Sequence, residues 1–317
     1  MNFFDILVTT IPVFAIVAVG CVTRAIGLVT DDSEKSIMRL VVNVLYPCFI
    51  LSKVFDNQSL QQWSVVGLSL IIGFVLMITG LAISYGAGRA FKLQQKDGLN
   101  TFCLSTAIQN YGFMPIPLIV ALFENSDATL GVMFIHNLGL ELAMWSVGIV
   151  VLSGTFAGAT KRLINGPTIA IIFGLAVNYS GASQLIPGFA TETIIQLGNC
   201  AIPIALLLVG ATLVGVLQRE KWVTDWKVVT GAVTVRFVIM PILFLTVASF
   251  VSFAPELSKV LIIQSAMPAG IFPIVLAKHF GGKPQVAVQV SIATSVVCLL
   301  MTPLLLTYAL KWFGIGA

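Results

Sequence analysis

Charge is what this sequence has least of, because only 9% of its 317 residues are Asp, Glu, Lys or Arg. A soluble domain carries about 25% charged residues, so this chain cannot cover a water-facing surface with charge. It also lacks any long polar stretch, which excludes a separate soluble domain. Hydrophobic residues make up 58% of the chain, and the mean hydropathy is +1.01. These values predict an all-α polytopic membrane protein.

Several function classes lack the residues that they need. The chain has two histidines, and its five cysteines fall in apolar segments without paired spacing, so no metal site and no disulfide framework is indicated. No HExxH, GxSxG or GxxxxGK[ST] motif occurs, which argues against an enzyme and against an ATP-driven pump. We therefore expect no cofactor. A net charge of +4 is explained by loop lysines and arginines, so no nucleic-acid partner is expected.

Ten apolar segments follow one another along the chain, and a spanning helix needs about 20 such residues. They cover residues 5–26, 36–56, 64–87, 99–123, 128–153, 166–180, 190–216, 228–252, 257–279 and 285–312, of which the sixth is short. The first has no basic residue ahead of it, so we expect a retained span and not a cleaved signal peptide. The sequence thus predicts ten membrane-spanning helices.

The basic residues predict the orientation of these spans. If the N-terminus lies outside, 13 of the 17 Lys and Arg residues fall on the cytoplasmic side and three on the outer side, with Arg236 inside a span. Lys and Arg concentrate in cytoplasmic loops, so both termini are expected on the outer side of the cell (inner) membrane. The charged stretch Asp31–Lys35 is interpreted as a solvated cytoplasmic loop.

A repeat divides the chain into two halves. Three pairs of residues are each separated by 156 positions, namely Asn43 and Asn199, Pro47 and Pro203, and Pro117 and Pro273. The simplest explanation is two homologous units of five spans, residues 1–156 and 157–317. Since five is odd, the second unit enters the membrane inverted, which is a feature of many secondary transporters.

The fourth and ninth spans carry matching interruptions. "IQNYGFMPIPLIV" (108–120) and "IQSAMPAGIFPIV" (263–275) each hold a polar pair followed by two prolines and a nearby glycine. Unsatisfied backbone costs several kcal/mol in hydrocarbon, so we expect both helices to break and cross where protein or a wet cavity surrounds them. Pro115 and Pro117, and Pro268 and Pro273, would open the second half-helices. Two such positive helix ends, with hydrogen bonds from Gln109, Asn110 and Ser265, would form an anion site.

At these motifs the chain resembles the auxin efflux carrier family, bacterial relatives of the plant PIN-type carriers in a wider group with bile-acid sodium symporters. The resemblance covers essentially the whole chain through "NVLYP", "NYGFMPIP", "HNLGLELAMW", "NCAIP" and "MPAGIFP". It implies a scaffold of spans 1, 2, 6 and 7, a moving transport domain of spans 3–5 and 8–10, and a homodimer. It also implies that the substrates are organic anions such as auxin or small carboxylates.

The resemblance assigns roles by position. Asn110 and Asn137 match the substrate-contacting asparagines of the family, and Pro117 and Pro273 match its crossover prolines. The second crossover has no asparagine, so Ser265, Ile271 and Phe272 are the expected contacts there. The remaining crossover and hinge candidates are Tyr111, Gly112, Pro115, Pro268, Gly270, Asn43, Pro47, Asn199 and Pro203.

Three ionisable residues lie inside spans. Glu141 is the only carboxylate placed deep in a span, where it could carry a coupling proton, hydrogen-bond Asn137 or pair with Arg236. His136 is interpreted first as a core histidine. The chain is therefore expected to be a secondary carrier of a small organic anion that works by an elevator-type alternating-access movement. A sodium-coupled symporter of the bile-acid type, or a receptor or enzyme without transport, remain the alternatives.

Overall fold

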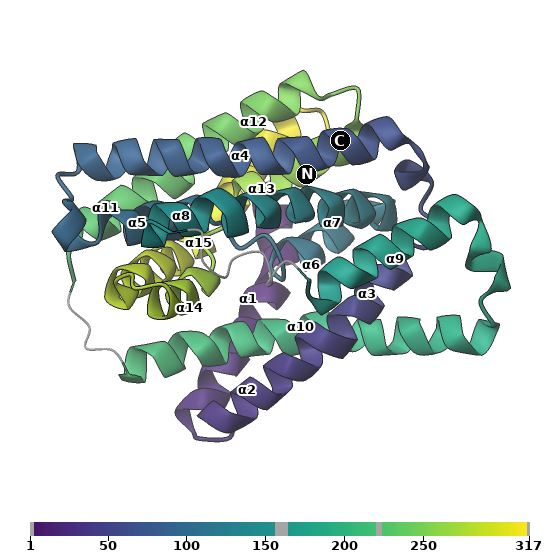
Figure 1. The fold of residues 1–317 in the computed structure, drawn as a ribbon, viewed down its shortest axis with the longest axis horizontal. Coiled ribbons are helices and arrows are strands. Elements are labelled where there is room, and N and C mark those ends of the chain that lie inside the picture. Colours follow the sequence, from purple (N-terminus) through teal and green to yellow (C-terminus); the bar gives the residue numbers. More distant parts are fainter. Residues whose placement is uncertain (1–2, 156–163, 220–223, 316–317) are drawn as a thin grey trace.

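The computed structural model describes residues 3–155, 164–219 and 224–315, and these ranges are helical without a β-strand (Figure 1). Seven helical segments are long and apolar enough to cross a membrane. They are α1 (Phe3–Ala25), α2–η1–α3 (Asp31–Val54), α4 (Trp63–Ala90), α7–η4–α8 (Ser126–Ser153), α10 (Gly188–Arg219, apolar to Gln218), α11–η7–α12 (Trp226–Phe250) and α15 (Pro284–Trp312). The all-helical prediction is confirmed.

The other three predicted spans are helical but shorter. The sixth is α9 (Gly166–Ser180), and the fourth and ninth are each divided into two helices. These are α5 (Leu99–Ala107) and α6 (Pro115–Leu122), and α13 (Pro255–Ser265) and α14 (Phe272–His279). The predicted breaks are therefore present. Ten membrane crossings related by an inverted repeat remain a prediction.

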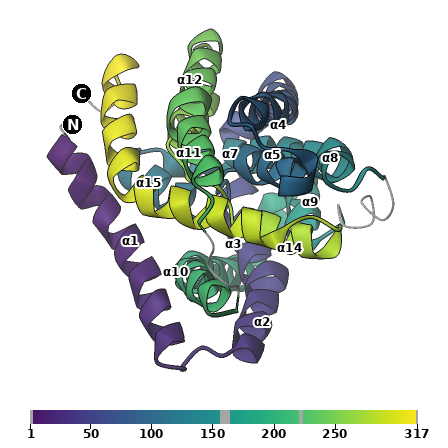
Figure 2. The same cartoon turned by 90° about the vertical axis from the view of Figure 1, so that its left-hand side faces the viewer.

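The helices pack in two groups. The first helix group contains α1, α2, α3, α9 and α10, in which α10 lies against both α1 and α3. The second helix group contains α4–α8 and α11–α15, with α4 against α5 and α7 and with α13 against α7 and α12. In Figures 1 and 2, α2 and α10 lie at the bottom while α4 and α12 lie at the top. The groups meet where α3 contacts α7 and where α1 contacts α6 and α15.

Glycines bring the long helices into close contact. A Cβ atom on Gly210 of α10 would lie 1.9 Å from the carbonyl oxygen of Val17 in α1, and one on Gly20 would lie 2.0 Å from that of Leu207. Between α4 and α7, Gly139 and Gly73 approach backbone carbonyls of the opposite helix just as closely. Small residues allow helices in lipid to pack backbone against backbone, since the hydrophobic effect does not drive their association.

Three spans contain a π-helical turn. These turns are η1 (Val41–Leu45), η4 (Met144–Gly148) and η7 (Val235–Ile239). Pro47 follows η1, and the Asn43 side chain there donates to the Arg39 carbonyl at 2.8 Å. In contrast, α10 remains an α-helix through Asn199 and Pro203. Only the first of the two matched Asn-Pro sites therefore changes its helix type, and a hinge at either site remains a prediction.

The loop expected at Asp31–Lys35 is instead the first turn of α2, so that prediction was wrong. Thr30 caps this helix by accepting a hydrogen bond from the Ser33 amide, and three carboxylates occupy its positively polarised N-terminal turn. Arg24, almost fully buried, pairs with Asp31 and Glu34 and fixes the connection from α1. Short 3₁₀ turns at Gln58–Gln61, Gln95–Asp97 and Ala182–Leu185 make further connections. Figure 2 places the start of α1 beside the end of α15.

Candidate functional site

The two broken helices pair with each other through their backbones. Gln109 and Ala269 form an isolated antiparallel bridge. The Asn110 amide donates to the Pro268 carbonyl at 2.8 Å, and the Gly270 amide donates to the Ile108 carbonyl at 2.9 Å. Each break therefore satisfies backbone groups that the other leaves without a helical partner, as a membrane interior requires.

Side chains from the eighth and tenth spans complete the second break. Arg236 Nη2 donates to Met267 O at 2.7 Å, and Thr302 Oγ1 donates to Ala266 O at 2.7 Å. Further along the break, Ser291 Oγ donates to Gly270 O at 2.8 Å. Thr294 Oγ1 accepts a hydrogen bond from Ala269 N at 3.1 Å. Two of these groups, Arg236 and Thr302, bind carbonyls just beyond the C-terminus of α13. Charge and hydrogen bonding there offset the negative end of the half-helix dipole.

A chain of buried amides runs beneath the crossing. Gln109 Nε2 donates to Gln264 Oε1 at 3.0 Å, and Gln264 Nε2 donates to Asn137 Oδ1 at 2.8 Å. Asn137 Nδ2 then donates to the Tyr111 carbonyl at 2.9 Å. All three side chains are at most 6% exposed. This chain holds α7 and both breaks together, so Gln109 and Asn137 serve first to build the crossing.

Asn110 differs from its neighbours because its side chain is half-buried. Among the described residues, no hydrogen bond uses its side-chain amide, although its backbone amide is bound. The Ser265 hydroxyl, in contrast, donates to Ile262 O within its own helix at 2.6 Å. Of the polar residues expected to contact a substrate, Asn110 is therefore the one whose side chain is available.

The prolines open the second half-helices with one exception. Pro115 is the first residue of α6, with Pro117 two positions later, and Pro273 is the second residue of α14. Pro268 lies in the extended segment before α14, where its carbonyl is part of the backbone pairing, so its expected place in the helix was wrong. Both eight-residue helices begin shortly after the crossing and direct their positive ends toward that region.

The glycines and apolar residues of the crossing have distinct surroundings. A Cβ on Gly270 would lie 3.3 Å from the Gln109 carbonyl oxygen, which explains a glycine where the backbones pair. Gly112 has open space around its Cα within 4 Å. Ile271 is half-buried and Phe272 is 41% exposed, with its ring edge-on to Trp145 at 5.8 Å. Gly112 and the half-buried Asn110 therefore mark a side of the crossing that is open to a ligand.

Glu141 joins the crossing to the first helix group. The side chains of Tyr111 and Asn165 lie beside its carboxyl group. Asn165 caps α9, since its Oδ1 accepts from the Thr168 amide at 2.9 Å. Arg236 is occupied at Met267, and neither it nor Asn137 is a partner of Glu141 in this structure. The two pairings considered for Glu141 from the sequence are therefore replaced by Tyr111 and Asn165.

Sequence reasoning missed Gln264 and Asn165. Gln264 is 155 positions after Gln109, close to the repeat spacing of 156. The repeat could therefore have identified Gln264 as the counterpart of Gln109. Asn165 had no such signal, because its contact with Glu141 arises only when α9 packs near α7. His136 is fully buried on α7 beside this region.

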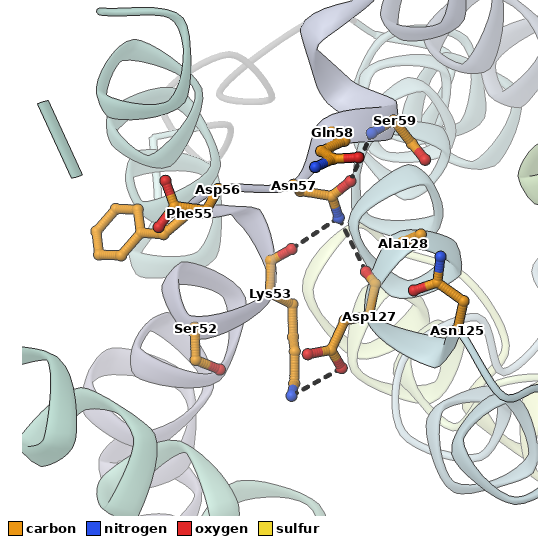
Figure 3. Close-up of a pocket in the computed structure, with 10 residues that line it drawn as sticks. All are labelled: Ser52, Lys53, Phe55, Asp56, Asn57, Gln58, Ser59, Asn125, Asp127 and Ala128. Carbon is orange, nitrogen blue, oxygen red and sulfur yellow. Dashed lines mark hydrogen bonds and ion pairs between the residues drawn. The ribbon is translucent and has the colours of Figure 1, made fainter. Parts of the chain in front are cut away.

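A separate pocket of about 400 Å³ lies away from the crossing, at the junction of the two helix groups (Figure 3). Its lining comes from the end of α3, the following turn and the start of α7. Lys53 pairs with Asp127 at 2.9 Å, and Asn57 Nδ2 donates to the carbonyls of both residues at 2.9 Å. These contacts connect the groups at one end of α7, as Glu141 and Asn165 do near its other end.

Comparison with known proteins agrees with this architecture. A family model described as "Membrane transport protein" matches residues 5–162 and 155–306. An uncharacterized transporter of Methanothermobacter thermautotrophicus is 24% identical over 288 residues, 87% of this chain and 89% of its own length. An uncharacterized transporter of Methanocaldococcus jannaschii is 22% identical over 278 residues, 83% of this chain and 86% of its own.

Proposed function

The chain belongs to the membrane transport protein family, which includes the auxin efflux carriers that its motifs resemble, and we propose that it moves a small organic anion through the crossing of its two broken helices. The carried species is a carboxylate, either auxin-like or a small dicarboxylate. The observation that supports this proposal best is the available Asn110 amide beside two helix N-termini.

The electrostatics of the crossing favour an anion. Each half-helix N-terminus carries roughly half a positive charge and unsatisfied N–H groups. The amide chain of Gln109, Gln264 and Asn137 is neutral. A carboxylate at Asn110 would therefore meet positive potential and directional donors, whereas a cation would meet neither.

The packing of the helices suits an alternating-access movement. The first helix group corresponds to the scaffold and the second to the transport domain of the elevator mechanism. Among the described residues, the polar links across their junction include Lys53–Asp127 and Glu141–Asn165. Movement of the second group past the first would break these links and carry the crossing with it. We further propose a homodimer in the cell membrane with both termini outside. The adjacent ends of α1 and α15 support the part of this proposal that places the two termini on one side.

Glu141 is the proposed site of a coupling proton. Its carboxyl group contacts Tyr111 of the break and Asn165 of the first helix group, so its charge acts on both. Protonation of the Glu141 carboxylate would weaken its contact with Asn165. An anion bound near Asn110 would favour that protonation. Sodium-coupled transport of the same anion is the alternative, and it differs in needing no proton at Glu141.

Uptake by proteoliposomes tests the carried species. Anionic, neutral and cationic solutes of similar size, such as indole-3-acetate, indole-3-acetamide and tryptamine, would be offered to the purified protein and to protein-free vesicles. We expect saturable uptake of carboxylates alone. Uptake restricted to neutral or cationic solutes would contradict the anion site, and a proton gradient compared with a sodium gradient would separate the two coupling modes.

A further inference from the structure

Behind the crossing, on the side of α4, lies a fully buried cluster that the transport proposal does not use. It consists of Arg236 in η7, Ser84 in α4, and Ser105 and Thr106 in α5, and all four residues are 0% exposed. We call these four residues the arginine layer. The side chains of the described residues provide no hydrogen-bond partner for Arg236 Nε and Nη1 or for the three hydroxyl groups.

Close packing of α4 against its neighbours, at two levels along its length, bounds the arginine layer above and below. On one side, Phe102 of α5 lies against Gly88 of α4 and Gly231 of α11, where an added Cβ would come within 3.0 and 3.2 Å of its ring. On the other side, Gly80 of α4 faces Met240 of α12, whose Cε would lie 2.7 Å from such a Cβ, and Ala107 of α5. α4 therefore contacts α5 and the eighth span at both levels.

The four polar residues fall between these two levels on each element. Ser84 is four residues from both Gly80 and Gly88, so it shares their face of α4. Ser105 and Thr106 come three and four residues after Phe102 and precede Ala107. Arg236 lies between Gly231 and Met240 in the π-turn. The four residues thus lie at the same level of α4, α5 and η7, which contact one another there.

A buried guanidinium without a carboxylate partner is costly. Its one hydrogen bond in the described ranges goes to a neutral carbonyl and uses one of five N–H donors. An uncompensated buried charge strongly destabilises a fold, and each unsatisfied hydroxyl adds to this cost. N–H and O–H donors around a positive charge are the groups that bind a small anion. Because Phe102 and Met240 pack closely against α4 on either side, the ion must be small.

We propose that the arginine layer binds a resident chloride-sized inorganic anion, held by Arg236 Nε and Nη1 and by the hydroxyls of Ser84, Ser105 and Thr106. The site is distinct from the proposed substrate position, because these residues lie on α4, α5 and η7 and Asn110 lies at the crossing. The anion would neutralise Arg236 and so stabilise the residue that binds the Met267 carbonyl. The ion is structural and is not carried.

Unfolding of the purified protein tests the proposal. The unfolding midpoint would be measured in sodium gluconate with increasing chloride at constant ionic strength, and again with acetate in place of chloride. We expect a saturable rise with chloride and a much smaller one with acetate. The Ser84→Ala/Thr106→Val variant should lose the rise. The matched control is Ser69→Ala, which removes another fully buried α4 hydroxyl, one that donates to Val65 O at 2.6 Å.

Bromide soaking then locates the ion, because bromide scatters anomalously. A peak beside Arg236 Nε and Nη1 is expected in the parent protein and should be absent in the double variant. Three results would overturn the proposal: a midpoint independent of chloride, a chloride response that the double variant retains, or an equal response to acetate. The last would mean that the layer takes carboxylates and belongs to the transport path. Each result can be obtained whether or not uptake of organic anions is observed.

Discussion

The side chains of Gln109 and Gln264 hydrogen-bond each other at 3.0 Å, although the two residues are 155 positions apart in the chain. Both are buried next to the backbone bridge between Gln109 and Ala269. One half of the protein thus supplies the partner for the other half at the point where both helices are interrupted. The crossing is consequently a single unit made by two distant segments.

We expect Gln109→Ala and Gln264→Ala to be non-additive in their effect on stability. Each removes the same hydrogen bond, and Gln264→Ala also removes the bond to Asn137, so the double variant should lose less stability than the sum of the two single losses. Interhelical hydrogen bonds in membranes contribute about 0.6 kcal/mol on average and up to about 1.7. A coupling free energy in the upper part of this range is expected from reversible unfolding in mixed micelles.

Gln196 provides the control for this cycle, since it is an exposed glutamine of α10 that binds Glu192 in its own helix. Gln109→Ala combined with Gln196→Ala should be additive. Additive losses for Gln109 and Gln264 would show that their contact does not stabilise the crossing.

Asn110→Ala should weaken substrate binding and leave the fold intact. Its side chain is half-buried without a partner among the described residues, so truncation costs no internal hydrogen bond. A lost hydrogen bond to a charged group costs about 1.5–3 kcal/mol, or about ten- to a hundredfold in Kd. Titration calorimetry with the carboxylate found in uptake experiments measures this, and Asn125→Ala, at the exposed start of α7, is the control. An unchanged Kd would remove Asn110 from the site.

Glu141→Gln should flatten the pH dependence of uptake and preserve substrate binding. The glutamine keeps the size of the side chain and can still contact Tyr111 and Asn165, but it fixes the neutral state. Uptake would be recorded from pH 5 to 8 with the membrane potential clamped, with and without a proton gradient. Glu192→Gln, an exposed carboxylate of α10, should keep the pH profile of the parent protein. The same profile in Glu141→Gln would assign Glu141 to a structural role.

Gly73→Ala should destabilise the second helix group much more than Gly67→Ala on the same helix. At Gly73 the added methyl would lie 2.1 Å from the His136 carbonyl oxygen, whereas at Gly67 nothing lies within 4 Å. Only Gly73→Ala would therefore force α4 and α7 to move apart. Gly67→Ala should be neutral, or stabilising by up to about 1 kcal/mol through its helix propensity. Equal unfolding midpoints for the two variants would contradict the close packing of these helices.

Hydropathy and proline spacing were sufficient to predict where the helices and their breaks lie. Each apolar segment has the length of a helix, and the prolines at 115 and 273 remove donors where the second half-helices begin. Both signals are local, which is why they can be read from a single chain.

The partners of the buried polar groups could not be predicted in this way. Arg236 binds the Met267 carbonyl rather than Glu141, and Glu141 lies beside Asn165 from another helix group. These choices depend on the rotation of each helix about its axis, which is set by packing such as that of Gly73 against α7. A hydropathy pattern places a residue at a depth but does not give its direction.

The pairing of the two breaks also has a consequence in time. Ile108 and Asn110 are synthesised about 160 residues before Gly270 and Pro268, with which their backbones bond. At about 5–20 residues per second, the first broken helix waits roughly 10–30 s for its partner. During that interval its open peptide groups need water, lipid headgroups or an insertion factor. Membrane insertion of the first half is thus provisional until the second half arrives.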